Sequence, residues 1–254
     1  MIVHQVWIGT KPAPEEWMST VESFCKSYGY TYMRWGNEEI QKLPIHKYHG
    51  IPQLLQEYLE NETQYKYAGL VDIYRTILLY EYGGVYLDSD MIILRPREFH
   101  TFLENHKEAL FYGWETNNTL IANSVIGCPK GHPYMKLCLD ELPFHADRFA
   151  EKPVWDRSGP GFVTHMYNRY GNLYENEIVI LPQTVFFPGG WHETRDKNAH
   201  TTRKFPKESL LFQYGYTTNS MEDQFKKKEG DFSGASVLFV AGLFVLSYYV
   251  TKRR

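Results

Sequence analysis

The sequence predicts an α/β fold built around one hydrophobic core, and three observations lead to this prediction. The chain of 254 residues is long enough for one ordinary domain with a full interior. Apolar residues recur at helical spacing over 67–82, Gly83-Gly84 should end that helix, and a short apolar β run follows at 85–87. A similar pair opens the chain, with a strand expected over 2–9 and a helix beginning near Glu15. Helices that alternate with buried strands are typical of an α/β domain.

The remaining elements follow from the same periodicities. A helix opens at Pro133, where His132 is expected to serve as a cap or turn residue, and His4 is expected to be satisfied in the core. Strands are expected over 30–35, 110–114 and 178–182, and helices over 37–40, 54–59, 97–105 and 162–170. Asn37 is expected to be the N-cap of the short helix over 37–40.

Composition narrows the range of functions. A formal net charge of -3 gives no electrostatic basis for nucleic-acid binding, so no nucleic-acid partner is predicted. The 20 tyrosines, 15 phenylalanines and 6 tryptophans fill the core and also suit a site that recognises sugars or nucleobases. The 3 cysteines form no CxxC pair, which argues against a disulfide scaffold and a structural zinc site and predicts buried thiols.

Four charged residues around the central helix and strand are candidates for chemistry. Asp72 and Arg75 share one face of the helix, where they can pair with each other or reach into a site. Asp88 and Asp90 follow the apolar strand, and two carboxylates this close at a buried strand end favour a cation as their partner. Oxygen ligands suit Mn²⁺ or Mg²⁺ shared with substrate phosphates. The alternative is structural: the two acids cap a turn and the helical pair is an ordinary salt bridge.

The pattern Asp72-x-x-Arg75 followed by Tyr82-Gly83-Gly84-x-Tyr86-x-Asp88-x-Asp90 resembles the DXD sugar-binding region of family 32 glycosyltransferases. That family includes fungal Golgi mannosyltransferases, sphingolipid mannosyltransferases, capsule sugar transferases and the glucosylating domains of clostridial toxins. The resemblance implies a single GT-A-type nucleotide-sugar-binding domain with a mixed, mainly parallel sheet flanked by helices. It also implies a hexosyltransferase that retains anomeric configuration and moves a hexose from UDP-hexose or GDP-mannose to an acceptor hydroxyl.

The same resemblance implies roles for individual residues. Trp7 would stack on the nucleobase, Asn123 would contact the donor sugar, and the Ser158-Gly159-Pro160 turn would match a family turn that has threonine first. After Ser220 the chain has Met221 where the family has tryptophan, and no histidine stands at the usual distance, which leaves the terminal metal and diphosphate contacts open. The implied catalytic residues are Asp72, Arg75, Asp88 and Asp90; the implied donor-binding residues are Trp7, Asp72, Arg75, Tyr86, Asp88, Asn123, Gly159 and Ser220; the implied ligands of Mn²⁺ or Mg²⁺ are Asp88, Asp90 and Ser220.

The expected organisation has three parts. Residues 1–221 would form the catalytic domain, 222–234 a charged linker, and the uncharged segment 235–250 a C-terminal membrane anchor, with a terminal core helix or strand as the alternative. No signal peptide is expected at the N-terminus, which would place the catalytic domain in the cytosol. The expected acceptor is a glycan, glycolipid or glycoprotein.

Two other functions fit parts of the pattern. A chain of the same fold with an altered C-terminal end is a candidate for a weak or inactive protein that only binds a sugar nucleotide. A phosphatase of the haloacid dehalogenase type also ends an apolar strand in DxD, but it does so after the first strand of the fold. Release of nucleoside diphosphate from a sugar nucleotide separates the transferase from both alternatives.

Overall fold

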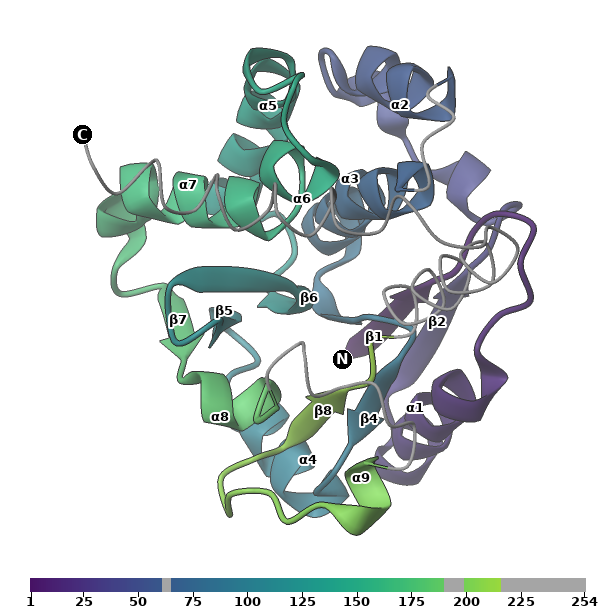
Figure 1. Ribbon diagram of the computed structural model, residues 1–254, viewed down its shortest axis with the longest axis vertical. Helices are drawn as coiled ribbons and strands as arrows, with labels where there is room; N and C mark the ends of the chain where they lie inside the picture. Colours follow the sequence, from purple (N-terminus) through teal and green to yellow (C-terminus); the bar gives the residue numbers. More distant parts are fainter. Residues whose placement is uncertain (61–64, 190–198, 216–254) are drawn as a thin grey trace, which may run out of the picture. The chain divides into compact units, whose positions relative to one another are not determined.

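The computed structural model describes residues 1–60, 65–189 and 199–215, and Met1–Tyr214 is one compact unit. A six-stranded sheet with the order β2-β1-β3-β6-β5-β7 runs through this unit (Figure 1). Its strands are Ile2–Val6 (β1), Thr31–Trp35 (β2), Gly84–Leu87 (β3), Leu110–Glu115 (β5), Leu120–Cys128 (β6) and Ile178–Leu181 (β7). A second, two-stranded sheet pairs Met91–Ile93 (β4) with Leu211–Gln213 (β8).

The large sheet is mixed and mainly parallel. β1 runs parallel to both β2 and β3, and β7 runs parallel to β5. β6 lies antiparallel to both of its neighbours, β3 and β5. The pairings therefore place β6 against the direction of the other strands of this sheet. The predicted α/β class and the mixed, mainly parallel sheet are confirmed.

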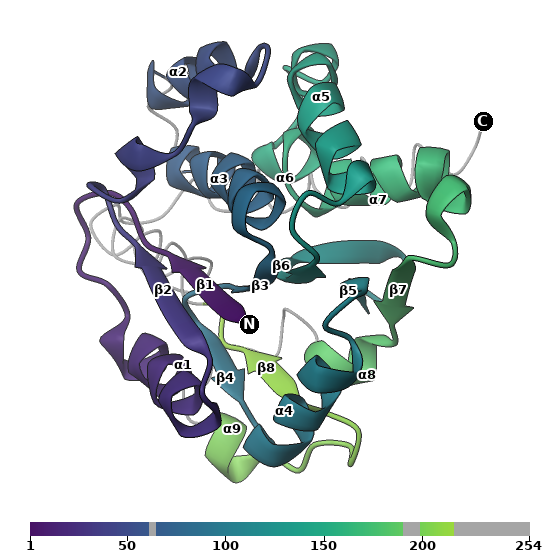
Figure 2. The same ribbon diagram turned by 180° about the vertical axis from the view of Figure 1, so that it is seen from behind.

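Helices cover both faces of this sheet, as both of the opposite views in Figures 1 and 2 show. The side chain of Tyr86 packs in one apolar cluster, and those of Val85 and Leu87 pack in the other, because successive strand residues point to opposite faces. The first cluster contains residues of Ile51–Glu60 (α2), Lys66–Tyr82 (α3), Pro133–Arg148 (α5) and Pro160–Tyr170 (α7); the second contains residues of Glu15–Tyr28 (α1), Pro96–Asn105 (α4) and Gln183–Phe186 (α8).

The end of α3 is fixed by two glycines, as predicted, and the structure adds a second reason. Gly83 and Gly84 have φ values of 66° and 101°, which glycine adopts without steric cost. A Cβ on Gly84 would also lie 2.2 Å from the carbonyl oxygen of Ile2. Glycine therefore allows β3 to approach β1 closely, and β3 then leads directly to Asp88.

Two predictions about the N-terminal region are wrong in detail. The strand expected over 2–9 ends at Val6. The helix expected over 37–40 is absent, and a short 3₁₀ helix begins only at Ile40. The Asn37 side chain, expected to cap that helix, instead accepts a hydrogen bond from the Gly9 amide at 2.9 Å and donates one to the Gly9 carbonyl at 3.0 Å.

Other predictions about single residues are confirmed. His4 is fully buried and hydrogen-bonded on both ring nitrogens. His132 is the N-cap of α5, where its Nδ1 accepts a hydrogen bond from the Tyr134 amide at 3.2 Å. All three cysteines are buried thiols.

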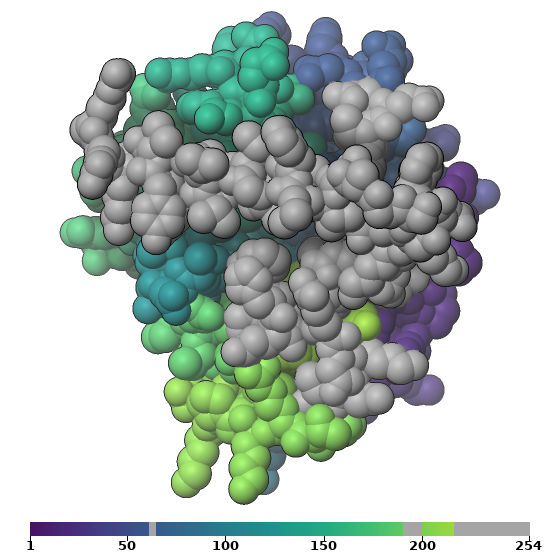
Figure 3. Space-filling model, viewed as in Figure 1, coloured from purple at the N-terminus to yellow at the C-terminus, as the bar shows by residue number. Residues whose placement is uncertain are grey.

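The C-terminal predictions concern residues beyond the described ones. The end of the catalytic domain at 221, the linker over 222–234 and the anchor over 235–250 all lie outside the ranges that the structure describes. Within those ranges, no helix combines the length and the apolar character that a bilayer crossing requires. The last described segment includes Ala199–Thr202 (α9) and β8, and it lies at the lower end of the face shown in Figure 3.

Candidate functional site

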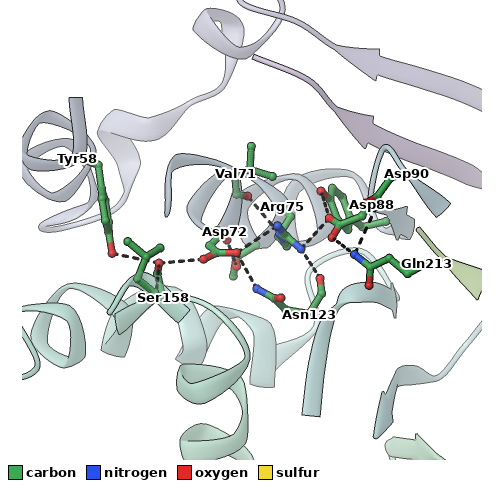
Figure 4. Close-up of polar contacts among 12 residues, drawn as sticks. Tyr58, Val71, Asp72, Arg75, Asp88, Asp90, Asn123, Ser158 and Gln213 are labelled. Carbon is green, nitrogen blue, oxygen red and sulfur yellow. Dashed lines mark hydrogen bonds and ion pairs between the residues drawn. The ribbon is translucent and has the colours of Figure 1, made fainter. Parts of the chain in front are cut away.

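A connected set of polar side chains extends from α2 to β8 (Figure 4). The helices α2 and α3, the strands β6 and β8, the turn after β3 and the turn before α7 all contribute to it. Tertiary packing therefore brings together residues that are far apart in the sequence. The connected residues are Tyr58, Asp72, Arg75, Tyr86, Asp88, Asp90, Asn123, Ser158 and Gln213.

Asp72 is a buried carboxylate with three donors. Its Oδ1 accepts from Asn123 Nδ2 at 2.7 Å and lies 3.1 Å from an Arg75 nitrogen, and its Oδ2 accepts from Ser158 Oγ at 3.0 Å. Because the serine proton points to Asp72, the Tyr58 hydroxyl, 3.1 Å from Ser158 Oγ, acts as the donor in that pair. Burial raises the pKa of Asp72 to about 6, while Arg75, Asn123 and Ser158 oppose the rise. The carboxylate is therefore mostly ionised at neutral pH.

Arg75 lies between two carboxylates. It is buried, and its guanidinium nitrogens lie 3.1 Å from Asp72 Oδ1 and 3.1 Å from Asp88 Oδ1. It also donates to the Asn123 carbonyl at 2.5 Å and lies over the Tyr86 ring at 4.5 Å. A buried guanidinium with two carboxylate partners and a carbonyl is well compensated. Arg75 thus fixes the positions of Asp72 and Asp88.

Asp88 is anchored through its backbone as well as its side chain. Its amide donates to the Ser124 carbonyl at 2.9 Å, and its carbonyl accepts from Gln5 Nε2 at 3.0 Å. Its Oδ1 accepts from the Tyr86 hydroxyl at 2.7 Å and faces Arg75. These contacts use one carboxylate oxygen and leave Oδ2 directed towards β8.

Gln213 brings the second oxygen of Asp88 and the carboxylate of Asp90 to one point. Its Nε2 donates to Asp88 Oδ2 at 3.1 Å and to Asp90 Oδ1 at 3.4 Å. β8 holds it there, because Gln213 pairs with Met91 across the small sheet and the Tyr214 amide donates to the Asp90 carbonyl at 3.1 Å. The two carboxylates diverge along an extended strand, but the turn after β3 lets them converge.

The donor set at this point fits a hard divalent cation. A partly positive N–H group already lies between two carboxylate oxygens, and oxygen ligands suit Mn²⁺ and Mg²⁺. Within the described ranges, no three His, Cys, Asp or Glu residues are grouped so that they could hold a metal. Of the carboxylates in the part of the chain that the structure describes, Asp88 and Asp90 are therefore the two that could bind a cation at this point.

An irregularity in β6 directs Asn123 towards α3. In the pairing of β5 with β6, Gly113 lies opposite Ala122 whereas Phe111 lies opposite Gly127, so the register shifts between these positions. Such a bulge re-aims side chains next to it. The Asn123 side chain is buried and reaches Asp72, so its proposed contact with the donor sugar would be made beside that carboxylate.

The other predicted donor-binding residues lie at different distances from this network. Gly159 is the N-cap of α7, and a Cβ there would lie 3.2 Å from Asp72 Oδ2, so the absence of a side chain lets the turn approach the carboxylate. Trp7 lies just beyond β1, is half-exposed and donates from Nε1 to the Lys11 carbonyl at 2.9 Å. Ser220 falls outside the described residues. Their binding roles remain predictions.

Two site residues were not predicted. Gln213 gives no sequence signal, because its place depends on the pairing of β8 with β4. Glu115 ends β5 and is half-buried; burial raises the pKa of its carboxyl to about 7, and the charge of Asp88 adds to the rise. No hydrogen bond or ion pair reaches this carboxylate from the residues that the structure describes. An acid at the end of the apolar run 110–114 was the available signal.

Comparison with known proteins identifies the region that carries the acids. Residues 14–111 match a family described as the glycosyltransferase sugar-binding region containing the DXD motif. The chain is 29% identical over 215 residues to inositol phosphoceramide mannosyltransferase 3 of Schizosaccharomyces pombe. This alignment covers 76% of this chain and 56% of that protein. It is 25% identical over 132 residues to lactosylceramide 4-alpha-galactosyltransferase of Gorilla gorilla gorilla, covering 49% of this chain and 36% of that protein. The chain thus spans about half of the first relative and about a third of the second.

One solved structure can be compared in the same way. The structure titled PaToxG Glycosyltransferase aligns with a TM-score of 0.49 and 21% sequence identity. The alignment covers 69% of this chain and 71% of that one.

Proposed function

We propose that the protein is a metal-dependent hexosyltransferase, because residues 14–111 match the glycosyltransferase sugar-binding region containing the DXD motif. It would move a hexose from a nucleotide-sugar donor, UDP-hexose or GDP-mannose, to an acceptor hydroxyl with retention of configuration. The observation that carries the proposal is the convergence of Asp88 Oδ2 and Asp90 Oδ1 on Gln213 Nε2, at 3.1 and 3.4 Å. Two carboxylates that converge on one point beside the buried Arg75 guanidinium can bind a divalent ion and, through that ion, a diphosphate.

The chain's own residues would position the donor. When a divalent cation is bound by Asp88 and Asp90, it supplies charge neutralisation for the diphosphate leaving group. Arg75 holds Asp88 from the opposite side, so that Asp88 Oδ2 stays directed at the binding point. Asp72, which is ionised and held by Ser158 and Asn123, would accept hydrogen bonds from hydroxyls of the hexose.

Glu115 would add a further contact to a sugar. A half-buried carboxylate that lacks a donor partner among the described residues is costly unless a ligand supplies hydrogen bonds. A polyol offers several hydroxyl donors at once. We therefore propose that Glu115 accepts a hydrogen bond from a donor or acceptor sugar.

The names of the two relatives suggest the kind of acceptor. One is named for inositol phosphoceramide and the other for lactosylceramide, which are both ceramide lipids with polar headgroups. We propose a glycosylated or inositol-containing sphingolipid headgroup as the acceptor of this chain, with the membrane segment expected over 235–250 bringing the site to the lipid surface.

The proposal is tested by incubating the purified chain with UDP-glucose, UDP-galactose or GDP-mannose, with Mn²⁺ or with EDTA. We expect Mn²⁺-dependent release of nucleoside diphosphate from one donor, and transfer to inositol phosphoceramide or lactosylceramide vesicles. Asp90→Asn should abolish the release, whereas Asp140→Asn should not, because Asp140 pairs with Lys136 on the exposed face of α5. Equal turnover in Asp90→Asn and the wild type would refute the metal role of Asp90.

The same assay separates the alternatives. Tight donor binding without release would support a binding protein of this fold. Phosphate release from a phosphomonoester would support a phosphatase. The anomeric configuration of a transferred sugar, read by NMR, tests retention.

A further inference from the structure

We infer that Gln213 is the third protein ligand of the divalent cation and that it turns its carboxamide when the ion binds. This inference rests on the proposed metal site and adds a residue to it. In the structure, the Gln213 amide donates to both acids through Nε2, at 3.1 Å to Asp88 and 3.4 Å to Asp90. A half-turn about the terminal torsion exchanges the positions of Nε2 and Oε1 and directs the carboxamide oxygen towards the point between the acids.

The amide is free to turn because its other end makes no competing bond. Gln213 Oε1 has no hydrogen-bond partner among the described residues, and the residue is half-buried. A turn would therefore exchange only the two contacts to Asp88 and Asp90. The broad, roughly two-fold torsion of a glutamine amide allows both orientations.

Electrostatics decide which orientation is favoured. With two carboxylates and no cation, the N–H end of the amide lowers the repulsion between the acids. With a divalent ion between them, the N–H end is repelled and the carbonyl oxygen is attracted. The two states thus require opposite orientations of one side chain.

The backbone keeps Gln213 within reach in both states. The register of β8 on β4 places Gln213 opposite Met91, the residue after Asp90, and the Tyr214 amide donates to the Asp90 carbonyl at 3.1 Å. The side chain can therefore turn without any change in the strand pairing. An amide oxygen is a hard ligand suited to Mn²⁺ and Mg²⁺, so the set of two carboxylates and one amide keeps its preference for these ions.

The test measures the affinity for Mn²⁺ alone, from the loss of the free-ion EPR signal on titration with the full chain, without a nucleotide. Gln213→Leu removes the ligand atom and keeps the side-chain size, and we expect its Mn²⁺ affinity to fall about tenfold or more. Gln213→Glu should bind Mn²⁺ more tightly than the wild type. Gln213→His should keep Mn²⁺ binding and shift the preference from Mg²⁺ towards Zn²⁺, since imidazole is a softer ligand than an amide oxygen. Gln183→Leu, at an amide that accepts from Asn117 on the surface, is the matched control and should bind Mn²⁺ like the wild type.

The outcomes distinguish this inference from the proposed function. If the wild type binds Mn²⁺ and Gln213→Leu binds it equally well or more tightly, Gln213 only occupies the site and is not a ligand. That result overturns this inference and leaves the proposed metal site of Asp88 and Asp90 intact. If the wild type does not bind Mn²⁺, the proposed metal site and the ligand role fail together. Circular dichroism of each variant in EDTA checks that the fold is kept, and the His and Glu variants decide the question if the Leu variant does not fold.

Discussion

His4 should make the stability of this protein fall as the pH is lowered below about 6.5, the ordinary pKa of histidine. Its Nδ1 lies 3.1 Å from Trp35 Nε1, which can only donate, so Nδ1 carries no proton. The proton is therefore on Nε2, which donates to the Gly83 carbonyl at 2.8 Å. A second proton would place two donors against each other in a fully buried position.

The magnitude follows from the pKa of the buried ring. Burial lowers the pKa of His4 from 6.5 to about 4, and the bond to the Gly83 carbonyl opposes part of this change. The unfolded chain then binds more protons than the folded one between these values, so the stability is complete above pH 6.5 and is lost as the pH falls towards 4. The loss should be about 2 kcal/mol at pH 5 and about 3 kcal/mol at pH 4.

Urea unfolding in EDTA at pH 7 and pH 5 measures this loss, with His4→Gln as the comparison. Glutamine can donate and accept but does not titrate in this range. Acids with raised pKa values, such as Asp72, change the stability in the opposite direction, and they cancel when the two proteins are compared. We expect the wild type to lose about 2 kcal/mol more than His4→Gln between the two pH values. Equal losses in both proteins would refute the assignment of the proton to Nε2 and the low pKa together.

Three further predictions concern stability. Gly84→Ala should lower the free energy of unfolding by more than Gly29→Ala. Both glycines have positive φ, but the added Cβ would lie 2.2 Å from the Ile2 carbonyl oxygen at Gly84 and would meet nothing within 4 Å at Gly29; equal losses in urea would contradict this. Ser158→Ala should cost about 1–2 kcal/mol in the same assay, because it removes a donor from buried Asp72, and an unchanged midpoint would exclude that role. Glu115→Gln should raise the free energy of unfolding in EDTA by about 1–3 kcal/mol at pH 9 and leave it unchanged at pH 4. Burial raises the pKa of the Glu115 carboxyl to about 7, so the charged form that predominates at higher pH destabilises the folded protein. A gain in stability at both pH values would contradict this reasoning.

The parts of the fold that could be predicted are those in which neighbouring residues carry the signal. Helical spacing over 67–82 and the glycine pair after it defined α3, and Asp72 and Arg75 were placed on one face because they are one turn apart. Asp88 and Asp90 were expected at a strand end, and the strand does end at Leu87. In each case, local sequence and tertiary structure favour the same geometry.

The predictions that were wrong or missing concern residues whose contacts depend on a partner far away in the sequence. Asn37 has the chemistry of a helix cap, but both ends of its amide bind Gly9, 28 residues away, and this contact replaces the cap. The contacts of Gln213 with the two acids span 125 and 123 residues, and no spacing in the sequence reports them. Glu115 could be recognised only as a charged end of an apolar run, since its environment depends on burial and on Asp88.

The position of β6 in the sheet affects how the nascent chain can fold during synthesis. β6 is inserted between β3 and β5, although it follows both of them in the sequence. A nascent chain that ends before residue 120 therefore lacks the strand that connects β3 to β5. The edges of β3 and β5 that pair with β6 in the folded protein are then exposed to other chains. Synthesis of β6, the hairpin partner of β5, pairs both of these edges and also brings Asn123 to Asp72, so the two edges are covered in the same step in which the contact between Asn123 and Asp72 can form.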